Sequence, residues 1–109
     1  MNIAHIADDF AVTAQIYPNE ISALAAAGFV AIICNRPDGE EPGQPAAADI
    51  AAACEAAGID FHHIPFASMP VGADLIEKQR QAMAGSDGAI LGYCRSGQRS
   101  QIIWAAASS

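Results

Sequence analysis

The stretch Ala89-Ile-Leu-Gly-Tyr-Cys94-Arg-Ser-Gly-Gln-Arg99-Ser-Gln-Ile-Ile-Trp-Ala105 joins two apolar runs through a polar turn. Residues 89–93 predict a buried strand, and the run that begins at Gln101 predicts the start of a helix. Cys94 therefore stands at the end of a strand, in a turn that contains glycine, below the N-terminus of a helix. The rest of the chain can be interpreted outward from this unit.

The preceding residues repeat the alternation of strands and helices. We expect a strand or hairpin at the sheet edge within 6–15, a helix from Pro18 to Gly28, a strand over 29–34, a loop over 35–45, a helix over 46–57, a strand over 61–65 and a helix over 73–84. The wholly apolar strand 29–34 indicates cover on both faces, as in a parallel sheet. The sequence predicts an α/β fold, a three-layer domain with a small, mostly parallel sheet and right-handed crossovers.

Length and charge limit the function classes. The chain has 109 residues and a formal net charge of −7, which fits a single domain over residues 1–109 and leaves open whether the native chain extends past Ser109. The acidic balance argues against a nucleic-acid partner. No apolar run approaches the ~18 residues of a membrane span, and the N-terminus lacks a secretory signal. Three cysteines without metal-ligand spacing fit a reducing compartment, so we expect a cytoplasmic protein.

The Cys94 turn carries the chemistry. Unpaired N–H groups at a helix N-terminus and in a tight loop stabilise an anion, and Arg95 and Arg99 add positive charge. Such surroundings lower a thiol pKa from about 8.5 to roughly 3.5–7.5. We therefore expect Cys94 to be a nucleophile and Arg99 a catalytic partner; the alternative is that Cys94 is a small buried hydrophobe. The expected anion-binding residues are Arg95, Ser96, Gly97, Gln98 and Ser100.

Two resemblances follow from these residues. The spacing Cys94, four residues, then Arg99 resembles the loop of rhodanese sulfurtransferases, whereas cysteine-dependent phosphatases have five intervening residues. The chain as a whole resembles the phosphatase-like domain of the beta-lactamase-hydrolase-like proteins. That resemblance covers nearly the whole chain and rests on Asn35-Arg-Pro-Asp-Gly-Glu-Glu-Pro-Gly-Gln-Pro45, His63-Ile-Pro65 and Cys94-Arg-Ser-Gly-Gln-Arg-Ser100. It implies a cysteine-phosphatase-like fold, similar to that of dual-specificity phosphatases.

The loop resemblance leads us to expect a sulfurtransferase that carries sulfur as a Cys94 persulfide. Cys94 would attack thiosulfate or a persulfide, and Arg99 would hold the anionic donor. Arg95 either steers the donor or is simply solvated. Because some relatives are fused to a persulfide-dioxygenase-type metallohydrolase, a partner of that type is a further expectation.

Two other functions stay open. A cysteine-dependent phosphatase would form a phosphoryl-cysteine and needs a general acid, for which Asp38 and Asp74 are the available carboxylates. Either carboxylate also has a structural interpretation, Asp38 in a turn and Asp74 at a helix N-terminus. The remaining function is a non-catalytic domain that binds anions or a partner protein.

We expect no cofactor and no metal. His62 and His63 are adjacent on a strand and therefore face opposite ways, which disfavours a shared ion. Cys54 is predicted to be a core residue. Cys34 ends its strand and is either a core residue or a resolving thiol for Cys94.

Overall fold

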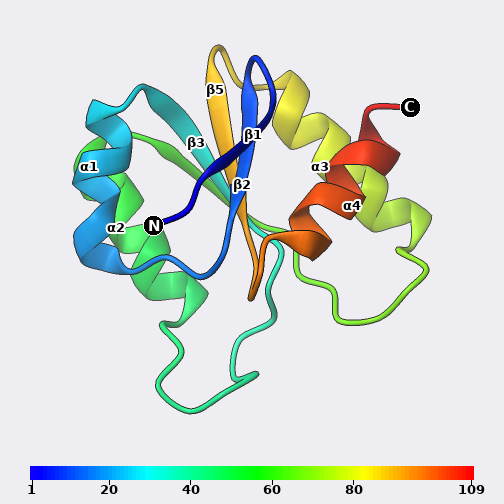
Figure 1. The fold of residues 1–109 in the computed structure, drawn as a ribbon, viewed down its shortest axis with the longest axis horizontal. Coiled ribbons are helices and arrows are strands. Elements are labelled where there is room, and N and C mark those ends of the chain that lie inside the picture. Colours follow the sequence, from blue (N-terminus) through cyan, green and yellow to red (C-terminus); the bar gives the residue numbers. More distant parts are fainter.

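The computed structural model describes residues 1–109 and confirms the predicted α/β architecture. In Figure 1, α1 and α2 cover one face of the sheet, and α3 and α4 cover the other. The elements in chain order are β1 (Ala4–Ala7), β2 (Phe10–Thr13), the 3₁₀ turn η1 (Pro18–Glu20), α1 (Ile21–Ala26), β3 (Phe29–Cys34), α2 (Ala47–Ala57), β4 (Asp60–His63), α3 (Ala73–Ala84), β5 (Ala89–Tyr93) and α4 (Gln98–Ala107).

The sheet places β5 at its centre. The strand order is β1-β2-β5-β3-β4, and only β1 runs antiparallel, to β2. Tyr93 at the end of β5 is level with Thr13 on β2 and with Cys34 on β3. Since the carboxyl ends of parallel strands are the usual place for function in α/β sheets, the loops after β2, β3 and β5 converge where Cys94 leaves the sheet.

Hydrophobic side chains fill the space on both sides of the sheet. Ile32 and Leu91 pack toward α1 and α2 with Ile50 and Cys54, which confirms Cys54 as a core residue. On the other face, Ile33, Ile90 and Ile103 belong to a second cluster. Val30 is an exception to the expected full burial of β3, because it is 37% exposed.

Several element boundaries differ from the prediction: the first hairpin begins at Ala4, and the predicted helix from Pro18 to Gly28 is divided into η1 and α1. β4 ends at His63 instead of Pro65, since proline has no N–H to continue a strand ladder. α4 begins at Gln98 instead of Gln101, directly after Gly97. Gly97 has a φ of 96°, a conformation that glycine adopts without steric cost. This early helix start brings its first N–H groups within three or four residues of Cys94.

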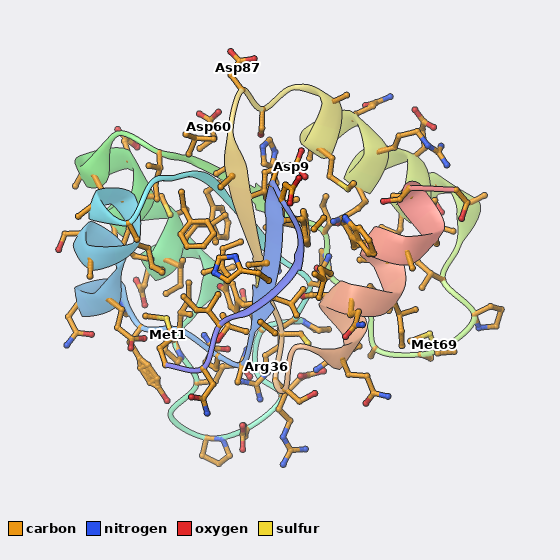
Figure 2. The ribbon with its side chains drawn as sticks, turned by 45° about the horizontal axis from the view of Figure 1, so that its top comes forward. Met1, Asp9, Arg36, Asp60, Met69 and Asp87 are labelled. Atoms are coloured by element: carbon orange, nitrogen blue, oxygen red, sulfur yellow. The ribbon has the colours of Figure 1, made fainter.

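The two ends of the sheet differ in charge. Figure 2 shows Arg36 at one end of the molecule and Asp9, Asp60 and Asp87 at the opposite end. Three of the five Lys and Arg residues lie at one end of the sheet: Arg36 in the loop after β3, Arg95 in the loop after β5, and Arg99 in the first turn of α4. Positive charge is therefore concentrated at the Cys94 end of an acidic molecule. None of the helices is long and apolar enough to cross a membrane.

Candidate active site

The loop after β5 surrounds the Cys94 sulfur with backbone N–H groups. The Gly97 N–H donates to Cys94 Sγ at 3.1 Å, and the backbone N–H groups of Ser96, Arg99 and Ser100 also act to lower the pKa of the thiol. A Cβ at Gly92 would lie 3.2 Å from the Ser100 Cβ, so glycine at this position allows α4 to approach β5 closely. The geometry is that of an anion-binding cup closed on a single sulfur.

Burial and hydrogen bonding act in opposite directions on the Cys94 thiol. Burial raises its pKa, but the hydrogen bonds from the loop N–H groups outweigh burial, and the pKa lies below its ordinary value. Burial raises the pKa of Cys34 and raises that of Cys54 to about 11. All three cysteines are free and buried, so the local N–H groups, and not burial, set Cys94 apart.

A thiolate titration tests this difference. We expect the ultraviolet absorbance of the wild-type protein minus that of Cys94→Ser to show a thiolate that forms below the ordinary thiol pKa of about 8.5. Because the folded-state pKa is below the unfolded one, the thiolate stabilises the fold above the unfolded pKa, and this contribution is lost as the pH falls through the folded pKa. If the difference signal appeared only at or above the ordinary thiol pKa, the claim that the loop N–H groups lower the pKa of Cys94 would be wrong.

Arg99 is held by groups from two other loops. Its NH1 donates to Glu40 Oε2 at 2.8 Å and to the Phe66 carbonyl at 3.0 Å, and its NH2 donates to Glu40 Oε1 at 2.8 Å. The guanidinium also lies beside the Cys94 sulfur. Ion pairing with Arg99, with a smaller effect of Arg36, lowers the pKa of Glu40 from 4.5 to about 2. This ion pair stabilises the fold above pH 4.5 and is lost as the pH falls toward 2.

Arg36 is a component of the site that the sequence interpretation missed. It follows β3, is 1% exposed, and donates from Nε to Glu40 and from NH2 to Glu41 at 2.9 and 2.7 Å. Its NH1 donates to Gln15 Oε1 at 2.9 Å. The available signal was an arginine placed directly after a buried strand and followed by two acidic residues.

The remaining residues of the Cys94 loop have distinct positions. Ser96 Oγ accepts the Gln98 N–H at 3.3 Å at the start of α4, and Gly97 is the N-cap residue of that helix. Ser100 Oγ is buried and has no hydrogen-bond partner. The Arg95 side chain is 71% exposed and lies 3.9 Å from Glu41, which places it on the rim. Gln98 is exposed on the first turn of α4.

The two predicted acids lie outside this arrangement. Asp38 Oδ1 accepts the Ala47 N–H at 2.8 Å and so caps the start of α2. Asp74 lies in the first turn of α3. Neither carboxylate lines the cavity beside Arg99. The Cys34 thiol donates to the Arg36 carbonyl at 3.3 Å, and Cys34 belongs to the core cluster under α2.

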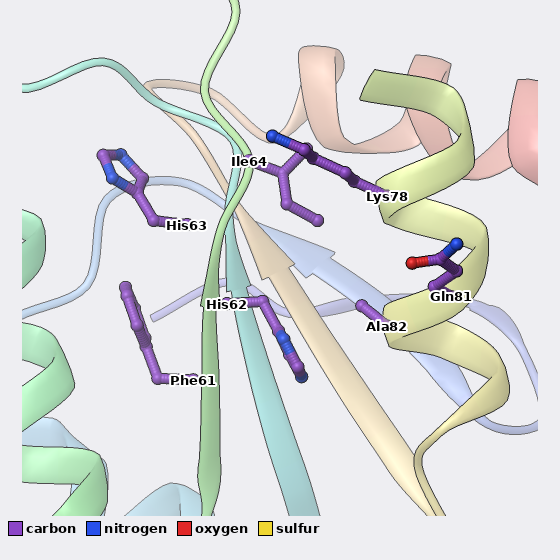
Figure 3. A pocket seen from close by; sticks show the side chains of 7 residues that line it. All are labelled: Phe61, His62, His63, Ile64, Lys78, Gln81 and Ala82. Atoms are coloured by element: carbon purple, nitrogen blue, oxygen red, sulfur yellow. The ribbon is translucent and has the colours of Figure 1, made fainter. Parts of the chain in front are cut away.

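Two cavities are candidates for the active site. One of about 410 Å³ is lined by Arg36, Glu40, Glu41, Ala67, Arg95 and Arg99 and adjoins the Cys94 loop. A cavity of about 480 Å³ lies between β4 and α3, and Figure 3 shows its lining residues, with His62 and His63 pointing in different directions. The larger cavity contains no cysteine and lies away from the Cys94 loop, whereas the cavity of about 410 Å³ is lined by Arg36, Arg95 and Arg99 next to Cys94. The smaller cavity is therefore the candidate active site.

A mostly parallel sheet that delivers a buried cysteine into a ring of N–H groups at a helix N-terminus defines a cysteine-phosphatase-like domain. Residues 2–109 match the family of the beta-lactamase hydrolase-like protein, phosphatase-like domain, and the chain belongs to this family. The chain is 33% identical over 104 residues to the beta-lactamase hydrolase-like protein of Agrobacterium fabrum, covering 95% of this chain and 24% of the relative. The chain thus spans about a quarter of that relative's length.

Solved structures agree with this assignment. A candidate phosphatase from Neisseria meningitidis has a TM-score of 0.85 and 33% identity, covering 95% of this chain and 74% of that one. The core catalytic domain of the PP-IP phosphatase Siw14 from Saccharomyces cerevisiae, solved with citrate, has a TM-score of 0.69 and 16% identity, covering 94% and 62%. The second likeness concerns the fold alone.

These comparisons correct the expected sulfurtransferase activity, which is wrong. The family and the structural neighbours are phosphatase-like. The expectation came from counting residues between Cys94 and Arg99 as a measure of cup width. In the structure, N–H groups form the cup, and Arg99 reaches out of the loop to Glu40 and Phe66, so the count does not define the size of the guest. The family match and the structural neighbours give no support for the expected persulfide-dioxygenase-type partner.

Proposed function

We propose that residues 1–109 form a cysteine-dependent phosphatase domain that hydrolyses small anionic phosphoesters through a phosphoryl group on Cys94. The observation that carries this proposal is the set of loop N–H groups on the Cys94 sulfur, which lowers the pKa of the thiol despite burial. Citrate in the yeast neighbour supports a site of this fold that accepts small anions. The activity of the longer relatives is not transferred to this chain.

In the first step the Cys94 thiolate attacks the phosphorus of the ester. The S–P bond forms, the P–O bond to the leaving group breaks, and the leaving oxygen takes the electron pair and a proton. The N–H groups that hold the thiolate are then available to the phosphoryl oxygens, and the Arg99 guanidinium offsets their charge. Covalent catalysis of this kind divides one difficult displacement into two easier ones.

In the second step water attacks the phosphorus of phosphoryl-Cys94. The S–P bond breaks, inorganic phosphate leaves, and the thiolate returns to its N–H cup. We assign Ser100 Oγ, which is buried and has no partner, to donate a hydrogen bond to the departing sulfur. Arg95 on the rim attracts the anionic substrate, and the smaller cavity receives it.

Trapping the intermediate tests the proposal directly. Protein quenched in acid during turnover of p-nitrophenyl phosphate is expected to contain a peptide with Cys94 that is heavier by one phosphoryl group. Peptides with Cys34 and Cys54 from the same digest are the internal controls. Hydrolysis without a phosphorylated Cys94 peptide, or no hydrolysis of any small phosphoester, would overturn the proposed function.

Asp38 is our proposed proton donor to the leaving oxygen, through one bridging water because its carboxylate does not line the cavity. Glu40 and Glu41 on the same loop pair with arginines, whereas Asp38 pairs with no cation and its Oδ1 accepts a backbone N–H. We expect Asp38→Asn to lower turnover of an alkyl phosphate by roughly 10²-fold and turnover of p-nitrophenyl phosphate much less, because p-nitrophenolate leaves without a proton.

The controls for this prediction are Asp74→Asn and thermal unfolding. If Asp38 acts only as a cap for α2, asparagine keeps the side-chain oxygen that accepts the Ala47 N–H, and both stability and turnover of the two substrates stay near the wild-type values. Unchanged turnover of the alkyl phosphate, or an equal loss with both substrates, would thus remove Asp38 from the mechanism. Asp74→Asn is expected to leave the turnover of both substrates unchanged.

A further inference from the structure

The buried guanidinium of Arg36 requires an explanation, because the proposed chemistry does not use it directly. An arginine stays charged at all accessible pH values, and a buried charge is costly unless it is paired. Every nitrogen of Arg36 donates a hydrogen bond, to Glu40, Gln15 and Glu41. Three of its five N–H donors are in use, and the residue is only 1% exposed, so Arg36 offers little surface to a substrate although it lies in the wall of the candidate site.

Glu40 connects Arg36 to the Cys94 loop. Its Oε1 accepts from Arg36 Nε at 2.9 Å and from Arg99 NH2 at 2.8 Å, and its Oε2 accepts from Arg99 NH1 at 2.8 Å. The Glu40 side chain is 24% exposed, so its position depends on these contacts. A carboxylate shared by two guanidinium groups fixes the direction of both.

The contacts of Arg99 show which of its donors remain. NH1 uses both hydrogens, on Glu40 and on the Phe66 carbonyl, and NH2 uses one on Glu40. Of the five N–H donors of an arginine, the Nε hydrogen and one NH2 hydrogen are left, and they form a two-donor edge. Since the same guanidinium lies beside the Cys94 sulfur, this edge is the part available to a phosphoryl group.

We propose that Arg36 is a positioning residue that acts through Glu40 to turn the free edge of Arg99 toward the substrate on Cys94. This inference rests on the proposed phosphatase function. Arg36 touches neither substrate nor sulfur; it holds the Glu40 carboxylate, and the carboxylate holds Arg99. Gln15 and Glu41 keep Arg36 itself in place, so the loops after β2, β3 and β5 jointly set the direction of one guanidinium.

A double-mutant cycle on Arg36→Lys and Glu40→Gln tests the connection. For each variant we would measure the dissociation constant of tungstate, an oxyanion of similar shape to phosphate, by calorimetry, and kcat and KM with p-nitrophenyl phosphate. Each single change is expected to weaken tungstate binding and lower kcat/KM by roughly 10- to 100-fold. In the double variant, tungstate affinity and kcat/KM are expected to be no lower than in the more affected single variant, because both changes break the same connection.

Two further variants separate positioning from folding. Glu40→Asp keeps the charge but shortens the side chain, so it cannot reach both arginines; it is expected to match Glu40→Gln even if Arg36→Lys does not fold. Arg80→Lys, which alters the surface pair of Arg80 with Glu77 at 2.6 Å on α3, is the matched control and is expected to behave as wild type. Thermal unfolding of each variant shows whether it is folded.

The outcomes distinguish this inference from the proposed function. If the wild type neither binds tungstate nor hydrolyses the ester, the proposed function fails, and this inference with it. If the wild type does both, but Glu40→Asp and folded Arg36→Lys equal the wild type, only the positioning role of Arg36 fails. Losses that multiply in the double variant would also overturn the inference, since Arg36 would then act independently of Glu40.

Discussion

Replacement of Cys94 by serine is expected to abolish hydrolysis of p-nitrophenyl phosphate, with a loss of roughly 10⁴-fold or more in kcat. The loop N–H groups lower the pKa of the Cys94 thiol and so favour its thiolate, but a serine hydroxyl remains protonated in the same position. Steady-state turnover of purified Cys94→Ser measures the effect. The cup itself would remain, so tungstate binding should be retained within a few fold.

Cys54→Ser is the matched control for this change. Cys54 is equally buried, lies on α2 under the sheet, and has a pKa raised to about 11. Its replacement is expected to lower stability without a specific loss of turnover. Turnover by Cys94→Ser at the level of Cys54→Ser would show that the reaction does not pass through the Cys94 sulfur.

Replacement of Arg99 by lysine is the second large effect that we expect. The guanidinium serves Glu40, the Phe66 carbonyl and the proposed substrate from three nitrogens, and an ammonium group on a flexible chain cannot serve all of them in fixed directions. We expect kcat/KM for p-nitrophenyl phosphate to fall by roughly 10² to 10³, the usual cost of one lost donor to transition-state charge.

The measurement for Arg99→Lys includes tungstate affinity and the surface control Arg80→Lys. Weaker tungstate binding together with lower kcat would show that Arg99 contacts the oxyanion. If Arg99→Lys and Arg80→Lys have the same kcat/KM, positive charge alone is sufficient at this position, and the directed role of Arg99 is wrong.

The sequence predicted the elements that carry the nucleophile. The run 89–93, the turn at Gly97 and the apolar start of the next helix are local signals, because each depends on residues a few positions apart. They placed Cys94 correctly at a strand end below a helix. The start of α4 was missed by three residues, since Gln98 to Ser100 are polar and only the conformation of Gly97 marks the boundary.

The polar network at the site was not predictable in the same way. Arg36 and Glu40 lie 59 to 63 positions from Arg99, and the pairing of three charged side chains depends on which loops the strand order brings together. Asp38 illustrates the same point: its carboxylate reaches a helix that starts nine residues later. The function was mispredicted because a residue count inside one loop was used to infer a shape that several loops determine.

The central place of β5 has a consequence for the opening of the molecule. Hydrogen bonds on both edges tie this strand to β2 and β3, so the backbone that bears the sulfur cannot detach without most of the sheet. Glu40 and Glu41 come from a segment without strand partners, where opening needs far less free energy. The strand that leads to the nucleophile thus needs more free energy to open than the loop that orients its arginine, and local opening of that loop would release the arginines while the sulfur stays in place.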